Sequence, residues 1–144
     1  MADAKKTISL ASLNAVAACD VPFTFEYRLP DGSKSGAYLK VLGAQSKKVQ
    51  SETNRLINER RQAQVQAEEA ARKFATFVPA QPVEDDIAFT QRLAAVRLVG
   101  WDGIDEPWTE AAALELCQSN SDLADQVVKA SNNLQNFMKN SRAA

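Results

Sequence analysis

VPFTFEYRLPDGSKSGAYLKVL, residues 21–42 of this 144-residue chain, decides the fold class because it predicts a β-hairpin beside segments rich in helix formers. Apolar and polar residues alternate from Phe23 to Arg28, which is the period of a half-buried strand. The residues PDG at 30–32 supply a chain reversal, and a second alternating run follows at 37–41. Because a two-stranded ribbon is only marginally stable by itself, we expect it to pack on helices or to pair with another chain.

A long helix is predicted directly after the hairpin. Residues 44–78 contain no glycine and no proline and are rich in Gln, Glu, Arg, Lys and Ala, so a continuous helix would be about 50 Å long. Pro79 and Pro82 end the helix-forming stretch. The apolar residues form a stripe too narrow for a strong coiled coil: Val49, Thr53, Leu56, Ala63, Ala67, Ala70, Phe74 and Phe77.

Three more helices are predicted in residues 79–144. The first follows an acidic start at 84–86 and is expected to be central and buried, with Gly100 as its stop; its apolar residues are Ile87, Phe89, Leu93, Ala94, Val96 and Leu98. Thr109 is a suitable N-cap for a short helix through Cys117, and Asn120 or Ser121 caps a last helix. The apolar face of this last helix runs for about four turns: Leu123, Val127, Ala130, Leu134 and Phe137.

The predicted fold class is therefore α+β and mostly α. It comprises an N-terminal segment with a β-hairpin (1–43), one long polar helix (44–78) and a small C-terminal three-helix unit (79–144), within one folding domain. Residues 138–144 are expected to be a frayed polar tail.

Composition and charge exclude several classes of protein. The net charge of −1 is not that of a typical nucleic-acid-binding domain, and no run approaches the roughly 18 apolar residues that a membrane span needs. The N-terminus is a poor signal peptide because polar residues interrupt its apolar run. The local balance is uneven, positive by three in 44–78 and negative by five in 79–144. A solvated surface explains this asymmetry, and so does self-association or a partner that contacts the acidic end.

The residues that carry most enzyme chemistry are missing or isolated. The chain has no histidine, which removes the commonest general base and metal ligand. Cys19 and Cys117 form no CxxC pair and are expected to be reduced and buried. The acidic clusters at 84–86 and 102–106 suit helix starts better than a metal site, and the glycines form no phosphate-binding loop. We therefore predict a protein without enzymatic activity, cofactor or metal.

Both tryptophans of the chain flank a Gly- and Pro-containing corner, VGWDGIDEPWTEAAALELC at 99–117. Two large rings can close such a corner by packing over the helix ends, and this interpretation is favoured for Trp101. An exposed tryptophan is instead a frequent anchor in protein interfaces. For Trp108 both interpretations stay open.

This corner and the last helix resemble the tail assembly chaperones of long-tailed bacteriophages. In that family a Trp, a short Gly-containing turn, a helix-capping Ser or Thr and a terminal helix ending near a Phe follow one another. LVGWDGIDEPWTEAAALELC and DLADQVVKASNNLQNFM show the same succession, and FEYRLPDGSKSGAYLKVLGAQS is similar to phage proteins from the same gene position. The corresponding residues here are Trp101, Gly103, Trp108, Thr109, Leu123, Val127, Leu134 and Phe137, with a role in client binding or in folding. The long, charged 44–78 helix departs from the compact members of the family and suggests an arm that contacts a neighbouring copy.

The resemblance implies a protein that binds the tape measure protein, keeps it soluble and helps tail tube protein to polymerise around it. It also implies action in the host bacterial cytoplasm, absence from the mature virion, a possible frameshift-extended form with slippage at Lys139-Asn140, and a possible homo-oligomer. No nucleic acid or membrane partner is implied. The alternative is a small structural tail or connector subunit whose hairpin adds a strand to a neighbour's sheet. A bacterial regulatory adaptor unrelated to phage is a third possibility.

Overall fold

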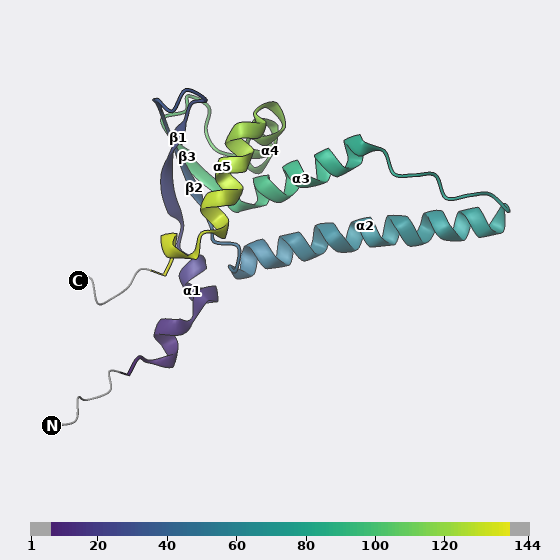
Figure 1. Ribbon diagram of the computed structural model, residues 1–144, viewed down its shortest axis with the longest axis horizontal. Helices are drawn as coiled ribbons and strands as arrows, with labels where there is room; N and C mark the ends of the chain where they lie inside the picture. The colour runs from purple at the N-terminus through teal and green to yellow at the C-terminus, as the bar shows by residue number, and fades with distance from the viewer. Residues whose placement is uncertain (1–6, 139–144) are drawn as a thin grey trace.

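The predicted hairpin is present in the computed structural model, which describes residues 7–138. Strands β1 (Phe23–Arg28) and β2 (Lys34–Val41) are antiparallel, and Phe25 lies opposite Leu39. Gly32 adopts φ +84° in the connecting turn, and its N–H donates to the Leu29 carbonyl at 2.7 Å. The confirmed fold class is α+β, with a long helix and three C-terminal helices after the hairpin (Figure 1).

The hairpin gains a third strand that the sequence analysis missed. Helix α3 (Val83–Arg97) was expected to reach Gly100, but it ends at Arg97 and the chain continues as β3 (Leu98–Asp102). β3 pairs antiparallel with β2, giving the sheet order β1-β2-β3. Gly100 lies opposite Lys40, where an added Cβ would be 3.3 Å from the Lys40 Cδ. The absence of a side chain at Gly100 leaves room for the aliphatic part of Lys40. The glycine that predicted a helix end therefore lies inside a strand.

Helix α2 (Lys47–Lys73) is shorter than the predicted 44–78. Its Ser46 N-cap side chain accepts a hydrogen bond from the Val49 N–H at 3.0 Å. At the other end Ala75 has φ +50°, and the Thr76 N–H donates to the Ala71 carbonyl at 2.8 Å. This is the hydrogen bond of a Schellman C-cap, and it places Phe74 and Phe77 beyond the helix.

Two short helices complete the C-terminal unit. Thr109 caps α4 (Glu110–Ser119) and Asn120 caps α5 (Ser121–Asn132), as predicted. The last helix is shorter than the expected four turns. It ends at Asn132, and a 3-10 helix (Leu134–Asn136) follows after Asn133 leaves helical geometry. Helix α1 (Ala15–Cys19) and a 3-10 helix (Leu10–Leu13) precede the sheet and were not predicted. Lys139, Asn140 and most of the expected polar tail lie outside the described residues.

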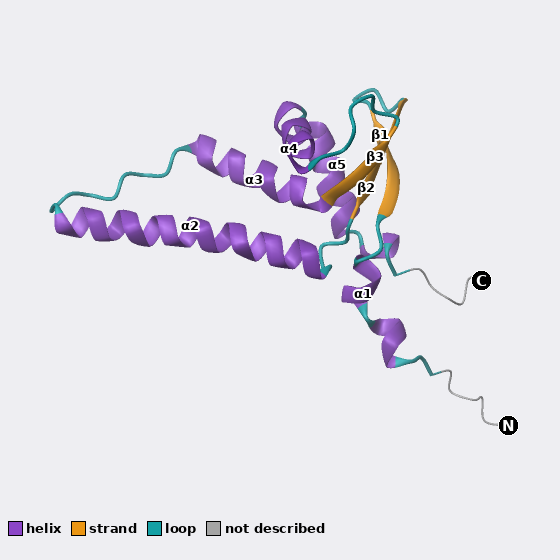
Figure 2. Ribbon diagram, turned by 180° about the vertical axis from the view of Figure 1, so that it is seen from behind, coloured by secondary structure: helices purple, strands orange, loops and turns teal. Residues whose placement is uncertain are grey.

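The molecule divides into a head and an arm, which Figures 1 and 2 show from opposite sides. The head is the sheet with α4, α5 and the adjoining ends of α2 and α3. Its core combines sheet and helix residues: Tyr27, Leu39, Val41, Leu98, Ala113, Leu123 and Val127. The arm is residues 57–92, in which the far part of α2 and the first part of α3 run side by side, joined by 74–82. The prediction that the apolar helix is buried is wrong for its first half, since Ile87 on the arm is half exposed.

Candidate interaction surfaces

The two tryptophans of the corner both pack against the core of the head. Trp101 lies on β3, and its indole N–H donates to the Glu106 carbonyl across the loop at 2.8 Å. The indole N–H of Trp108 donates to the Leu98 carbonyl on the same strand at 3.2 Å. Each indole thus satisfies a backbone carbonyl while its ring covers apolar side chains.

Gly103 and Thr109 shape the backbone on either side of this corner. Gly103 has φ +77°, and an added Cβ would lie 3.2 Å from the carbonyl carbon of Gly36 and closer still to its oxygen. A residue with a side chain would therefore push the corner away from the hairpin. The Thr109 hydroxyl oxygen accepts from the Ala112 N–H at 3.0 Å, which begins α4.

The four site residues predicted on the last helix divide between the core and the surface of the head. Leu123 and Val127 on α5 are buried, and Phe137 lies edge-on to Phe23 with ring centroids 6.0 Å apart. Leu134 is 37% exposed and lies outside this cluster. The structure therefore brings Trp101, Trp108, Leu123, Val127 and Phe137 together around one core rather than on one open surface.

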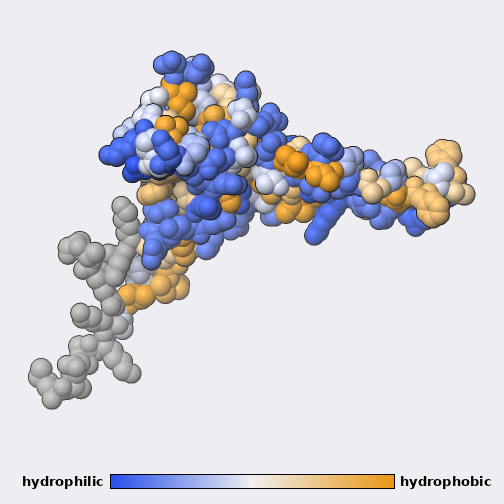
Figure 3. Space-filling view, turned by 45° about the horizontal axis from the view of Figure 1, so that its top comes forward, coloured by the Kyte–Doolittle hydropathy of each residue, from blue (hydrophilic) through white to orange (hydrophobic). Residues whose placement is uncertain are grey.

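Exposed apolar residues gather instead in the segment before the sheet, which we call the N-terminal patch: Ile8, Leu10, Leu13 and Val21. Leu10 is 88% exposed. The segment is attached to the head through Cys19, whose carbonyl accepts from the Gly43 N–H at 3.0 Å, and through Asp20, which accepts from the Lys47 N–H at 3.0 Å. Figure 3 shows apolar side chains over this segment and again towards the far end of the arm.

The second exposed group lies at the far end of the arm, and we call it the arm tip. Phe74 is 69% exposed and Phe77 is 96% exposed. Arg72 and Lys73 occupy the last turn of α2 beside them, and the Lys73 ammonium lies 5.7 Å from the centroid of the Phe74 ring. Both phenylalanines follow the spacing of the helical stripe in the sequence, which predicts them on the helix. Only Pro79 and Pro82 signalled a chain break, and they follow the true end of the helix by several residues.

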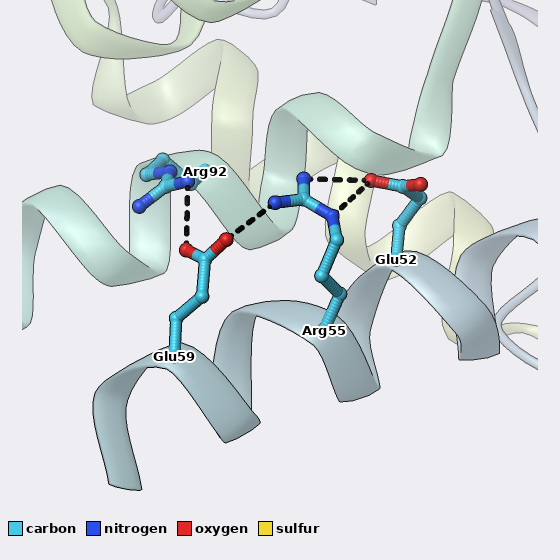
Figure 4. Close-up of polar contacts among 4 residues, drawn as sticks. All are labelled: Glu52, Arg55, Glu59 and Arg92. Carbon is cyan, nitrogen blue, oxygen red and sulfur yellow. Dashed lines mark hydrogen bonds and ion pairs between the residues drawn. The ribbon is translucent and has the colours of Figure 1, made fainter. Parts of the chain in front are cut away.

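Charged side chains link α2 to α3 where the arm leaves the head (Figure 4). The Glu59 carboxylate pairs with Arg55 on its own helix at 2.7 Å and with Arg92 on α3 at 3.5 Å. Arg60 pairs with Asp86 on α3, and its guanidinium lies 4.6 Å from the centroid of Phe89. Such exposed pairs contribute little to stability individually.

A groove opens on the opposite side of α3 from α2, where α3, α4 and α5 meet. Its floor is formed by small apolar residues that include Ala94, Cys117 and Ala124, and Asp86 and Asp125 lie at its rim. Its volume is about 260 Å³. The lining is mostly apolar, with carboxylates at the edge.

Both cysteines are free and buried, as predicted. Burial raises the pKa of the Cys117 thiol to about 11, which makes it a poor nucleophile at neutral pH. Burial also lowers the pKa of the Arg97 guanidinium, which donates to the Leu93 carbonyl. The residues from 7 to 138 bring no three Cys, Asp or Glu side chains together as a possible metal site. No helix in the same range has the length and apolar character of a membrane span.

A family model described as YdaY prophage protein matches residues 43–144. The chain belongs to the YdaY prophage protein family. The match covers α2, the C-terminal helices, β3 and the tryptophan corner, and it gives the protein a phage origin. No curated protein and no solved structure matches the chain. The phage part of the resemblance found in the sequence is therefore confirmed.

Proposed function

We propose that this YdaY-family protein is a tail assembly chaperone that binds the tape measure protein, keeps it soluble and assists polymerisation of the tail tube around it. The observation that carries the proposal is the N-terminal patch. A small protein that packs both tryptophans, partly buried, against the core of its head leaves Ile8, Leu10 and Leu13 uncovered on a segment anchored at Cys19. Apolar surface of this kind marks a site of protein interaction, and a long, apolar, helical client is the partner it suits.

The alternative of a structural tail subunit requires a free strand edge, and the hairpin offers less of one than its sequence suggests. The Gln126 side chain on α5 accepts from the Arg28 N–H at 3.1 Å and donates to the Arg28 carbonyl at 2.8 Å. These two bonds occupy the backbone groups at the end of the edge strand β1, where a neighbouring strand would pair. The geometry therefore favours the chaperone over strand addition.

The test is co-expression of the full chain with the tape measure protein encoded by the same prophage. We expect the soluble fraction of the tape measure protein to rise severalfold and the two proteins to purify together. The combined substitution Ile8→Ser, Leu10→Ser and Leu13→Ser should abolish this gain without changing the melting temperature, because these side chains are exposed.

A matched control is Val65→Ser on the arm, also at an exposed apolar position, which should retain client binding. The proposal fails if the tape measure protein is equally insoluble with and without the chain. It also fails if the protein is found as a stoichiometric component of purified particles, because that result indicates a structural subunit.

A further inference from the structure

The groove between α3, α4 and α5 has the size and chemistry to accept an aromatic side chain. A benzene ring fits a cavity of about 150 Å³, and this groove, which is open to solvent, has a volume of about 260 Å³. Ala94, Cys117 and Ala124 provide an apolar floor, and the exposed Asp125 lies at the rim. A fitting ligand is therefore an aromatic ring with a cation beside it.

The arm tip presents this combination. Phe77 and Phe74 project into solvent, and Arg72 and Lys73 precede them in the chain. Asp86, at the other part of the rim, already pairs with Arg60, so Asp125 is the carboxylate that remains available to these cations. Exposed phenylalanines beside two cations therefore match an apolar groove with Asp125 at its rim.

A chain cannot place its own tip in its own groove. The 27 residues of α2 extend for about 40 Å, and the tip lies at the end of the arm furthest from α4 and α5 (Figures 1 and 2). We propose that the arm tip of one copy of this protein docks in the α3–α4–α5 groove of a second copy.

The contact joins two different surfaces, so the assembly depends on how the tips are exchanged. Two copies that exchange tips reciprocally form a symmetric dimer, and copies that each give their tip to a further neighbour form a closed ring or an open chain. One tip in one groove is a small interface, so the association is expected to be weak and concentration-dependent. High salt should weaken it further, because exposed charges steer the contact.

The experiment is sedimentation velocity on the purified full chain over a wide range of protein concentration. The wild type should form dimers or larger species as the concentration rises. Phe77→Glu on the tip and Asp125→Lys at the groove should each weaken association at least tenfold, which corresponds to about 1.4 kcal/mol. Val65→Glu and Asp105→Lys are the matched controls, because both lie at exposed positions outside tip and groove, and both should associate as the wild type does.

Mixing the two variants gives a result that no general surface effect would produce. Phe77→Glu keeps an intact groove and Asp125→Lys keeps an intact tip, so an equimolar mixture should form one-to-one dimers and nothing larger. Circular dichroism checks that both variants are folded, as expected for substitutions at exposed sites.

Three outcomes would overturn the proposal: a wild type that is monomeric throughout, variants that associate like the wild type, or a mixture that stays monomeric. The measurement uses no tail protein, so its result is independent of the chaperone function.

Discussion

The head and the arm are stabilised by different interactions. In the head, each strand packs against other elements and α4 and α5 pack against several, and the buried Ser131 hydroxyl donates to the Leu42 carbonyl at 2.8 Å. In the arm, two helices run side by side, and the ion pairs Glu59–Arg92 and Arg60–Asp86 join them. Apolar burial stabilises a fold far more than exposed ion pairs do. The head therefore supplies the folding stability, and the arm presents surface.

The largest expected difference in the free energy of unfolding is between a side chain shortened in the head and one shortened in the arm. Leu39→Ala, at a fully buried position on β2, should lower the free energy of unfolding by about 2–5 kcal/mol, because it removes packed atoms and leaves a cavity. Phe77→Ala at the arm tip should change it by less than about 0.5 kcal/mol, since the ring is exposed. Urea unfolding followed by tryptophan fluorescence measures both. Equal losses would show that the arm tip belongs to the core and that head and arm are not separate in stability.

Trp108 tests whether the corner belongs wholly to the head. Trp108→Ala should lower the free energy of unfolding by about 3 kcal/mol, because the ring packs on the core and its N–H bonds the Leu98 carbonyl. Trp108→Phe should recover most of this loss, since it keeps a ring and loses one hydrogen bond. Client binding, measured well below the melting temperature, should be unchanged in both variants. Normal stability with lost binding would instead make Trp108 a contact residue.

The elements that local patterns predict correctly are those fixed by neighbouring residues. Alternation from Phe23 to Arg28 specifies the strand because both faces of β1 are set by residues two apart. Thr109 and Asn120 were identifiable as N-caps because a cap needs only a hydroxyl or amide before a helical run. Such features depend on little beyond a few consecutive residues.

The features that the sequence did not predict depend on distant segments. Leu98–Asp102 continues the apolar character of α3, and only pairing with β2 makes it a strand. The point at which α2 ends could not be read from the sequence. Ala75 takes the left-handed position that glycine usually fills, so no glycine or proline marks the helix end.

The same limit applies to the candidate site. The tryptophan corner shows the residue types of an interface, but both rings pack, partly buried, against the core of the head. Phe74 and Phe77 continue the spacing of a packed stripe, but the arm has nothing packed over them. Which apolar residues are exposed is decided by tertiary packing, and a single sequence does not contain that packing in any local pattern.

Cys117 provides a probe of packing between α3, α4 and α5. Its pKa is raised from 9.0 to about 11 in the folded protein, so the unfolded chain loses the thiol proton at lower pH than the folded chain. The stability associated with the protonated thiol is fully present below pH 9 and is lost as the pH rises towards 11. The loss should reach about 2 kcal/mol, since a tenfold change in proton affinity corresponds to about 1.36 kcal/mol.

The measurement is the free energy of unfolding between pH 8 and 11 for the wild type and for Cys117→Ala. The variant should show a shallower decline over this window, because it lacks the thiol and is otherwise the same chain. Parallel curves would mean that the site around Cys117 is accessible to water, and that the head is looser between these helices than beneath the sheet.

The smallest change in the free energy of unfolding is expected for the ion pairs that join α2 to α3. Glu59→Gln removes the charge that links Arg55 on α2 to Arg92 on α3, and it should lower the free energy of unfolding by less than about 0.5 kcal/mol because the pairs are exposed. The local consequence should be clearer than the global one. Amide hydrogen exchange in the first half of α3 should accelerate, while exchange in β2 and α5 stays unchanged.

Glu69→Gln, further along α2, is the matched control and should leave exchange in α3 as in the wild type. High salt should reproduce the effect of Glu59→Gln in the wild-type protein, because it screens exposed charges. If exchange in β2 accelerated as much as exchange in α3, the arm would open only together with the head. The two parts would then form one cooperative unit despite the different interactions within them.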